Sequence, residues 1–402
     1  MKIAVLGYGT IGSGVVEAIE KNQENIAKRA GDEIIVKYVL DLREFPGQPV
    51  EDILVHEFPV IAEDEEIECV VEAMGGVEPA YSYVKESLLR GKSVCTSNKE
   101  LVAKHGAELL EIARQKKVNF LFEASVGGGI PIIRPLNQSL TADEIVEITG
   151  IVNGTTNYIL TKMSQEGATF EAALKEAQAL GYAERNPEAD VEGYDAGRKL
   201  AILTSLAYGM QVDYEDIYME GITKITDIDF KYAKVLNAEI KLLATEKKNG
   251  ENIYAMVTPK MIRDNNPLFS VRGVLNSILV KGDLLGDTMF YGSGAGKLPT
   301  ASAVVSDVIE AVKHVGTNIT TIWSSKKLAL SDRMDAESGF FVRVKEAEAQ
   351  KAKELFGDVE EVCAGVAGEF AFVTKKMSER DFAEKAEQIT VLNRIRTEWC
   401  AE

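Results

Sequence analysis

The chain has 402 residues, of which 46% are hydrophobic and 27% are charged, which is the composition of a globular protein with two or three domains. Its net charge of −18 argues against nucleic acid and against anionic membranes as partners. The four cysteines form no CxxC motif, so we expect neither a zinc knuckle nor a disulfide framework. No apolar run reaches the length of a membrane span and the sequence opens directly in a strand, which predicts a cytoplasmic protein.

Residues 2–6 (KIAVL) predict a short strand that leads at once into a glycine-rich turn and a helix. The turn is Gly7-Tyr8-Gly9-Thr10-Ile11-Gly12, a G-x-G-x-x-G pattern in its required place between strand and helix. Such glycines let the backbone approach a pyrophosphate at the helix N-terminus, so we expect this turn to bind a dinucleotide. A glycine-rich turn without a ligand is the alternative.

The next predicted strand, residues 34–40, ends at Asp41. An acid at this position accepts hydrogen bonds from the ribose hydroxyls of NAD and repels the 2′-phosphate of NADP. Arg43 could instead pair with a 2′-phosphate, so the cofactor is predicted as NAD or NADP. The alternative is that Asp41 is an ordinary turn residue without a role in cofactor binding.

Strands and helices then alternate through the first third of the chain. The predicted strands are residues 68–73, 92–96 and 118–122, with helices over 79–90 and up to 116. This alternation predicts an α/β fold with a Rossmann-type, doubly wound parallel sheet, in which ligands bind beyond the carboxyl ends of the strands. Three polar segments follow those ends: Gly75-Gly76, Asn98-Lys99 and residues 123–129.

The pattern changes after residue 133 and predicts an α+β domain with an antiparallel or mixed sheet. The expected strands are 144–152, 253–259, 276–282 and 284–291, and the expected helices are 158–165, 169–180 and 195–208. A sheet of this kind commonly packs with a second subunit, so we expect a homodimer or homotetramer. A second glycine-rich loop, residues 291–299, precedes a helix over 300–314, and its Gly294 is expected to approach the nucleotide unless the loop is only a hinge.

Residues 181–203 form an acid-rich loop that runs into an apolar helix. Asp195 and Lys199 are four residues apart and therefore share one side of that helix. Desolvation and the helix dipole at the first turn would make such a lysine easier to deprotonate, which suits it to proton transfer. An ordinary ion pair explains the spacing better by itself, but an acid-rich approach suits an amino or hydroxyl ligand. The three histidines lie in no motif, so catalysis by histidine is not expected.

Together these segments resemble the homoserine dehydrogenase family. The matching motifs are GYGTIGSGV, EAMGG, TSNK, EASVGGGIP, NGTTNYIL, GYAERNPEADVEGYDAGRKLAIL and GSGAGKLPTASAVVSD, in family order over residues 1 to about 320. The resemblance implies an NAD(P)-dependent oxidoreductase that interconverts L-aspartate 4-semialdehyde and L-homoserine in amino-acid biosynthesis. No aspartate-kinase domain stands upstream, so the monofunctional form is expected.

The resemblance also implies roles for individual residues. Lys199 would be the acid/base lysine beside Asp195, and Lys99 a second active-site lysine that touches substrate and cofactor. The implied substrate residues are Glu184, Asp190, Thr155, Gly154 and Tyr182. The implied cofactor residues are Gly7, Gly9, Thr10, Ile11, Gly12, Asp41, Arg43, Gly75, Asn98 and Gly294.

A monovalent cation, Na⁺ or K⁺, is implied as well. Glu123 and the backbone of Val126, Gly128 and Ile130 match the family's cation site, and an oxygen cage of this kind suits a hard cation. Leu40 stands where the family often carries an arginine, which favours NAD or dual use over a strong NADP preference.

The C-terminal region predicts a separate domain after a linker over residues 323–338. The expected order is strand 339–345, a helix to 356, strands 359–364 and 369–374, helix 378–388 and strand 390–398. This βαββαβ order is ferredoxin-like and resembles an ACT domain, a regulatory module for amino-acid feedback. Residues 346–348 (EAE) replace the usual Asp-x-Pro-Gly turn, so a threonine sensor and an oligomerising module are equally supported.

The predicted domains are therefore residues 1–133 with 299–322 for the dinucleotide, 134–298 for the substrate, and 338–402 as the ACT-like module. Two other functions compete with the leading one: a dehydrogenase of a related amino acid or semialdehyde, and a non-catalytic nucleotide sensor. The Glu184 and Asp190 pair disfavours substrates without an ammonium group. A sensor would not need Lys199 beside Asp195.

Overall fold

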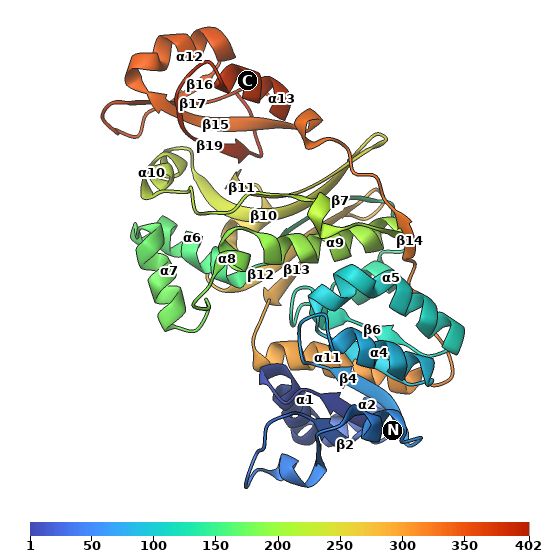
Figure 1. Ribbon diagram of the computed structural model, residues 1–402. Coiled ribbons are helices and arrows are strands. Elements are labelled where there is room, and N and C mark those ends of the chain that lie inside the picture. The colour runs from blue at the N-terminus through green and yellow to red at the C-terminus, as the bar shows by residue number, and fades with distance from the viewer. Residues whose placement is uncertain (402) are drawn as a thin grey trace. The chain divides into compact units, whose positions relative to one another are not determined.

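The computed structural model describes residues 1–401 (Figure 1). The chain divides into two compact units. The first unit holds residues 1–143, 201–214 and 292–328, and the second holds residues 144–200, 215–291 and the C-terminal part from 329. No helix in residues 1–401 combines the length and the apolar character that crossing a membrane requires.

The first unit is built on a six-stranded parallel sheet with strand order β3-β2-β1-β4-β5-β6. Its strands are β1 (Lys2–Leu6), β2 (Ile35–Leu40), β3 (Leu54–Val55), β4 (Ile67–Glu72), β5 (Ser93–Thr96) and β6 (Phe120–Leu121). Its helices are α1 (Thr10–Lys21), α2 (Gln23–Ala30), α3 (Phe58–Ala62), α4 (Ala80–Leu89), α5 (Lys99–Lys116) and α11 (Lys297–Lys313). The predicted Rossmann-type parallel sheet is thereby confirmed.

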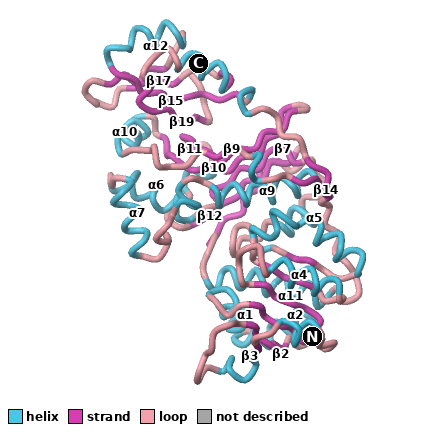
Figure 2. Tube along the Cα trace, in the orientation of Figure 1, coloured by secondary structure: helices cyan, strands magenta, loops and turns pink. Residues whose placement is uncertain are grey.

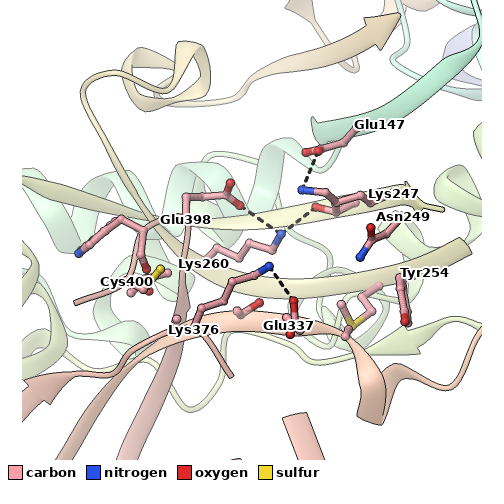
Figure 3. A pocket seen from close by; sticks show the side chains of 16 residues that line it. Glu147, Lys247, Asn249, Tyr254, Lys260, Glu337, Lys376, Glu398 and Cys400 are labelled. Atoms are coloured by element: carbon pink, nitrogen blue, oxygen red, sulfur yellow. Dashed lines mark hydrogen bonds and ion pairs between the residues drawn. The ribbon is translucent and has the colours of Figure 1, made fainter. Parts of the chain in front are cut away.

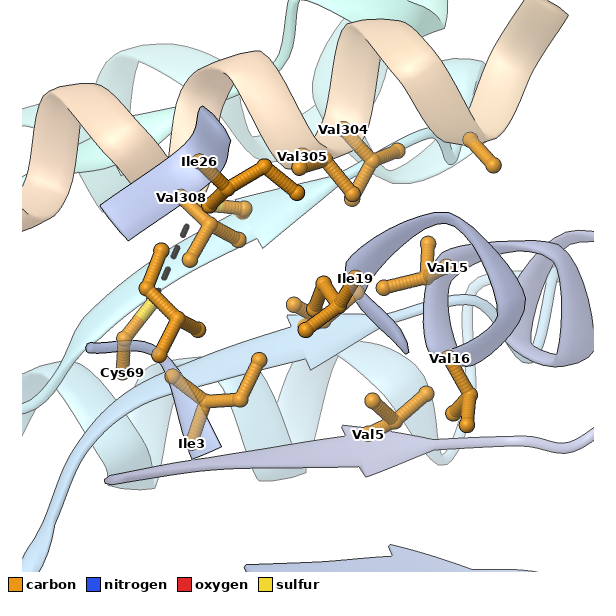
Figure 4. Close-up of a cluster of buried hydrophobic side chains, with 14 of the residues drawn as sticks. Ile3, Val5, Val15, Val16, Ile19, Ile26, Cys69, Val304, Val305 and Val308 are labelled. Carbon is orange, nitrogen blue, oxygen red and sulfur yellow. Dashed lines mark hydrogen bonds between the residues drawn. The ribbon is translucent and has the colours of Figure 1, made fainter. Parts of the chain in front are cut away.

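Helix α11 returns from late in the chain and packs on α1, as Figure 4 shows. Val304, Val305 and Val308 join the buried side chains of β1 and α1 in one apolar cluster. The two helices approach closely because α1 has a glycine at their contact: a Cβ on Gly14 would lie 2.9 Å from the Lys297 carbonyl oxygen. Each fully buried valine or isoleucine contributes roughly 1.5–3 kcal/mol to folding. This cluster therefore holds β1 and α1 in place on either side of the glycine turn that joins them.

The cysteines are all free, as predicted. Cys69 on β4 and Cys95 on β5 are buried in the same cluster with their Sγ atoms 3.8 Å apart. Burial raises the pKa of the Cys95 thiol well above its usual value. Both side chains therefore pack as small apolar groups.

The second unit is built on one mixed sheet of 11 strands, with a main path β13-β12-β7-β10-β11-β19-β15-β17-β16. Before residue 300 its strands are β7 (Ile145–Ile151), β9 (Tyr218–Met219), β10 (Ala238–Asn249), β11 (Asn252–Arg263), β12 (Leu275–Gly282) and β13 (Gly286–Ser293). Its helices there are α6 (Gly154–Glu166), α7 (Phe170–Ala179), α8 (Glu188–Val191), α9 (Tyr194–Tyr208) and α10 (Asp227–Val235). The four predicted strands are present as β7, β11, β12 and β13, and Figure 2 shows strands in magenta.

Several elements differ from the prediction. Strand β10 and helix α10 were not predicted from the sequence, and residues 324–327, expected within a linker, form β14 (Ser324–Lys327), which pairs with β8 (Met210–Gln211). Helix α6 begins at Gly154 instead of Tyr158, because the Asn153 side chain caps it by accepting a hydrogen bond from the Thr156 N–H. The loop predicted over residues 153–157 is therefore mostly the first helical turn.

The C-terminal region has the predicted βαββαβ order. Its elements are β15 (Glu337–Lys345), α12 (Ala349–Phe356), β16 (Glu360–Val362), β17 (Glu369–Val373), β18 (Met377–Ser378), α13 (Glu379–Ala386) and β19 (Val391–Thr397). Phe340, Phe356, Phe372 and Phe382 form its core, and the rings of Phe340 and Phe382 stack with centroids 4.3 Å apart. Because β19 pairs in parallel with β11, this domain continues the sheet of the second unit.

Candidate active site

The glycine turn of the first unit has the geometry of an anion site. Gly7 has a φ of +92°, which favours glycine, and a Cβ on Gly12 would overlap the Gly7 carbonyl oxygen. A Cβ on Gly9, in contrast, would meet nothing within 4 Å. Helix α1 begins at Thr10, so the free N–H groups of its first turn, including that of Ile11, point out of the turn. Open space in front of these N–H groups suits a diphosphate.

Asp41 follows β2 and is tied to the same turn. Its Oδ2 accepts a hydrogen bond of 2.7 Å from the Tyr8 N–H. The Arg43 guanidinium donates to it from Nε at 2.9 Å and from Nη2 at 2.8 Å. These bonds with Arg43 hold the pKa of Asp41 far below its ordinary value. The Asp41 carboxylate therefore stays negatively charged, and it engages two N–H donors of the Arg43 guanidinium.

Glu72, a residue that no sequence motif marks, organises the rim of the sheet beyond β4 and β5. Its side chain is fully buried, and burial raises its pKa. Oε1 accepts from the Gly75 N–H at 3.2 Å, and Oε2 accepts from the Thr96 hydroxyl at 2.6 Å. The only signal in the sequence is an acid at the end of an apolar strand. Glu72 thus fixes Gly75 relative to the end of β5.

Asn98 and Lys99 lie at the same rim. Asn98 caps α5, because its Oδ1 accepts from the Leu101 N–H at 3.1 Å, while its Nδ2 donates to the Gly76 carbonyl oxygen at 2.6 Å. Lys99 is the first residue of α5. The structure therefore brings together the predicted segments Gly75-Gly76 and Asn98-Lys99.

Glu123 is buried and holds the chain that follows its own loop. Its carboxylate accepts from the N–H groups of Ile132 at 2.6 Å, Ile133 at 2.8 Å and Arg134 at 2.8 Å. Asp307, not predicted from the sequence, accepts from the Glu123 N–H at 2.8 Å and pairs with Arg134 at 2.7 Å. Burial, with the charge of Glu123, raises the pKa of Asp307 to about 7, against the opposing effect of Arg134.

The loop between Glu123 and these partners presents peptide oxygens. Among residues 1–401, no donor reaches the carbonyl oxygens of Val126, Gly128 and Ile130. A Cβ on Gly128 would overlap the Gly294 carbonyl oxygen, so the second glycine-rich loop lies directly against the first. No cluster of three or more His, Cys, Asp or Glu side chains occurs in this described part of the chain.

In the second unit, Lys199 and Asp195 form the predicted pair on α9. Nζ of Lys199 donates to Asp195 Oδ2 at 2.7 Å and to the Val152 carbonyl oxygen at 2.7 Å. The side chains are 12% and 10% exposed, which means that the pair is largely shielded from water. Lys199 is the sixth residue of α9, so the expectation that it lies in the first turn was wrong. The helix starts at Tyr194, before the acid.

Asn153 joins this pair to the acidic loop, a role that the sequence did not reveal. Its Nδ2 donates to Asp190 Oδ1 at 2.7 Å and to Asp195 Oδ2 at 2.9 Å. The neighbouring Thr155 hydroxyl donates to the Tyr182 carbonyl oxygen at 2.7 Å. Asp190, Asp195, Thr155 and Tyr182 are thus held around one helix N-terminus.

The remaining predicted substrate residues lie at the edge of this cluster. Tyr182 is 44% exposed and packs edge-on against Tyr158. A Cβ on Gly154 would lie 2.8 Å from the Val274 carbonyl oxygen, so only glycine fits there without movement. Glu184 is exposed, and no hydrogen bond within residues 1–401 connects its carboxylate to the cluster.

The glycine turn, the acid after β2 and the lysine held by a carboxylate define an NAD(P)-dependent oxidoreductase. The sequence profile described as "Homoserine dehydrogenase, NAD binding domain" matches residues 7–123, and that described as "Homoserine dehydrogenase" matches residues 131–309. The chain belongs to the homoserine dehydrogenase family.

Individual relatives agree with this assignment. The homoserine dehydrogenase of Bacillus subtilis is 42% identical over 323 residues, covering 80% of this chain and 75% of the relative. That of Synechocystis is 48% identical over 318 residues, covering 78% of this chain and 73% of the relative. The crystal structure of a homoserine dehydrogenase from Thiobacillus denitrificans superposes with a TM-score of 0.88 at 33% identity, over 99% of this chain and 98% of that one. A hyperthermophilic archaeal homoserine dehydrogenase in complex with NADPH has a TM-score of 0.67 at 29% identity, over 77% of this chain and 97% of that one.

Proposed function

We propose that this enzyme reduces L-aspartate 4-semialdehyde to L-homoserine, and runs the reverse oxidation, with Lys199 as the acid/base group. The bound nicotinamide supplies the hydride to the aldehyde carbon. Lys199 donates a proton to the carbonyl oxygen as that oxygen gains negative charge, and is then reprotonated from water.

The observation that carries this role is the hydrogen bonding of the Lys199 ammonium. An ammonium group has three N–H donors. Within residues 1–401, two of them go to Asp195 Oδ2 and to the Val152 carbonyl oxygen, which leaves one for the substrate. Asp195 thus orients Lys199 and keeps its charge balanced, while Lys99, at the N-terminus of α5, is the second lysine of the proposed site.

We assign the substrate's ammonium group to the acidic loop. Asp190 is held in place by Asn153, and Glu184 is a further acid on the same loop. Thr155, Gly154 and Tyr182 complete this wall of the site. L-Homoserine should therefore be oxidised, whereas 4-hydroxybutyrate, which lacks the ammonium group, should show a kcat/KM lower by about a hundredfold or more, because it cannot form the proposed ion pair with the loop acids. Comparable turnover of the two alcohols would contradict the assignment.

We assign the cofactor to the rim of the parallel sheet. The diphosphate would lie on the turn formed by Gly7, Gly9, Thr10, Ile11 and Gly12, where Gly9 leaves open space. Gly75, Asn98, Lys99 and Gly294 are the further proposed contacts.

The Asp41–Arg43 pair supports a preference for NAD. Asp41 carries a permanent charge and already holds the Arg43 guanidinium, so a 2′-phosphate would meet repulsion without a free arginine. Asp41→Asn should release Arg43 and lower the ratio of kcat/KM for NAD⁺ to that for NADP⁺ by at least about tenfold. The control is Glu44→Gln, which removes an exposed acid nearby. An unchanged ratio in Asp41→Asn would show that this pair does not select the cofactor.

The residues around Glu123 fit the proposed monovalent cation, Na⁺ or K⁺. Within the described residues, 1–401, the peptide oxygens of Val126, Gly128 and Ile130 accept no hydrogen bond, and such oxygens are the ligands that hard cations prefer. The Glu123 carboxylate holds the following segment through its N–H groups and supplies a compensating negative charge. The cation would provide rigidity to a loop that contacts Gly294.

The C-terminal domain is proposed to take an amino-acid effector and the enzyme to be a homodimer or homotetramer. A cavity of about 280 Å³ lies where β10 and β11 meet β15 and β19 (Figure 3). Its lining includes the ion pairs Lys247–Glu147, Lys260–Glu398 and Lys376–Glu337. Groups of both signs suit a zwitterion such as L-threonine. Inhibition of homoserine oxidation by L-threonine would support a sensor, and its absence, with an oligomer in solution, would favour a purely oligomerising module.

A further inference from the structure

We propose that Glu220 is a positioning residue through which the C-terminal domain holds the acidic substrate loop, residues 181–193. Glu220 directly follows β9 and is remote in sequence from both. The inference rests on the proposed substrate role of Asp190, which lies in that loop. Three sets of contacts support it, all within the second unit.

The first set fixes Glu220 itself. Its N–H donates to the Val257 carbonyl oxygen on β11 at 2.8 Å. Its carboxylate Oε2 lies 2.7 Å from Nη1 of Arg396 and 3.1 Å from Nη1 of Arg394, both on β19. Burial raises the pKa of Glu220, but the charges of these two arginines outweigh burial and lower it. Glu220 is therefore a charged group clamped by the C-terminal domain.

The second set makes Arg396 a rigid clamp. Arg396 is fully buried and also donates to both carboxylate oxygens of Glu379 on α13, at 2.5 and 3.0 Å. Its strand pairs with β11 at the positions Lys260↔Arg396 and Met261↔Thr397. If Glu220 moved away, the buried positive charge of Arg396 would lose one of its two carboxylate partners. Because an uncompensated buried charge is strongly unfavourable, Glu220 is held in place.

The third set connects Glu220 to the substrate loop. The Ile222 N–H donates to the Val191 carbonyl oxygen at 2.8 Å. A Cβ on Gly221 would overlap that same oxygen, so the two backbones touch. Val191 follows Asp190, whose Oδ1 is held by Asn153. A displacement of Glu220 would therefore reach Asp190 through only a few covalent and hydrogen bonds.

The same segment also supports the helix of the acid/base lysine. A Cβ on Gly197 would overlap the Met219 sulfur, which means that the residue before Glu220 packs directly against α9. Gly197 lies between Asp195 and Lys199. Residues 219–222 thus contact both the substrate loop and the catalytic helix.

The test is the neutral, nearly isosteric variant Glu220→Gln in the full-length enzyme, assayed for homoserine oxidation. We expect the KM for L-homoserine to rise by about tenfold, since small displacements of substrate-holding groups have effects of this order or larger. The KM for the nicotinamide nucleotide should stay unchanged, and kcat should change less than the KM for homoserine. Circular dichroism and thermal melting establish that the variant is folded.

Asp229→Asn is the matched control. Asp229 on α10 is also buried and pairs with a buried arginine of the C-terminal domain, Arg343, at 2.6 Å, but within residues 1–401 no hydrogen bond or ion pair joins it to Val191. Asp229→Asn should lower the melting temperature as much as Glu220→Gln does and leave the KM for homoserine unchanged. Arg394→Gln, which removes only the weaker partner of Glu220, should give a smaller rise in the same KM and covers the case in which Glu220→Gln does not fold.

Asp190→Asn separates failure of this inference from failure of the proposed substrate site. If Asp190→Asn raises the KM for homoserine while Glu220→Gln and Arg394→Gln do not, Glu220 has no positioning role. An equal rise of the KM for homoserine in Asp229→Asn and Glu220→Gln would contradict specific positioning by Glu220. It would indicate that both variants loosen the domain in general. An unchanged KM in Asp190→Asn would overturn the substrate site and the inference together.

Discussion

Lys199→Ala is expected to lower kcat for homoserine oxidation by about 10²- to 10⁴-fold, the usual contribution of a positioned acid/base group. The dissociation constant of the nicotinamide nucleotide should stay unchanged, because the glycine turn is part of the first unit and Lys199 of the second. Steady-state kinetics give the first quantity, and titration of nucleotide fluorescence gives the second.

Lys231→Ala is the matched control for Lys199→Ala. Lys231 on α10 also stands four residues after an aspartate, Asp227. Its Nζ is 3.8 Å from Asp227 Oδ2, and the lysine side chain is 58% exposed. An exposed pair of this kind contributes little, so kcat should be unaffected. If Lys199→Ala retained nearly full turnover, the proton-transfer role of Lys199 would be wrong.

Gly12→Ala should abolish nucleotide binding and destabilise the protein. A Cβ at this position overlaps the Gly7 carbonyl oxygen, so the turn has to open. Overpacking of this kind costs roughly 1–3 kcal/mol, and a displaced turn no longer presents its N–H groups to a diphosphate. Thermal melting and nucleotide titration measure the two effects.

Gly9→Ala separates folding from binding at the same turn. Alanine readily adopts the φ of −80° found at Gly9, and a Cβ added there would meet no protein atom within 4 Å. The melting temperature should therefore stay unchanged. The methyl group would instead enter the space assigned to the diphosphate and weaken nucleotide binding by at least about tenfold. Unchanged affinity in Gly9→Ala would place the diphosphate elsewhere.

Local sequence was sufficient where the structure depends on neighbours in the chain. The strand, glycine turn and helix of residues 2–21 follow one another directly, so their pattern determines both the fold and the expected ligand. Asp195 and Lys199 are one helical turn apart, and their contact follows from helix geometry.

Long-range pairing explains what the sequence did not reveal. Strand β10 (AEIKLLATEKKN) is rich in residues that favour helices, and it is a strand because β7 and β11 pair with it on both sides. Asn153 reaches partners 37 and 42 residues away, and nothing in its local sequence distinguishes it from a solvated turn residue. Glu72 likewise accepts a hydrogen bond from Thr96, 24 residues away at the end of the neighbouring strand β5.

The most direct test of the central claim follows the absorbance of reduced nicotinamide with purified protein and L-homoserine. NAD⁺ and NADP⁺ are compared in parallel, each with and without K⁺ or Na⁺. The predicted result is homoserine-dependent growth of absorbance that is faster with NAD⁺ and stimulated by one of the cations. No growth in any of these mixtures, together with measurable nucleotide binding and no reduction of L-aspartate 4-semialdehyde in the reverse assay, would contradict the assigned reaction.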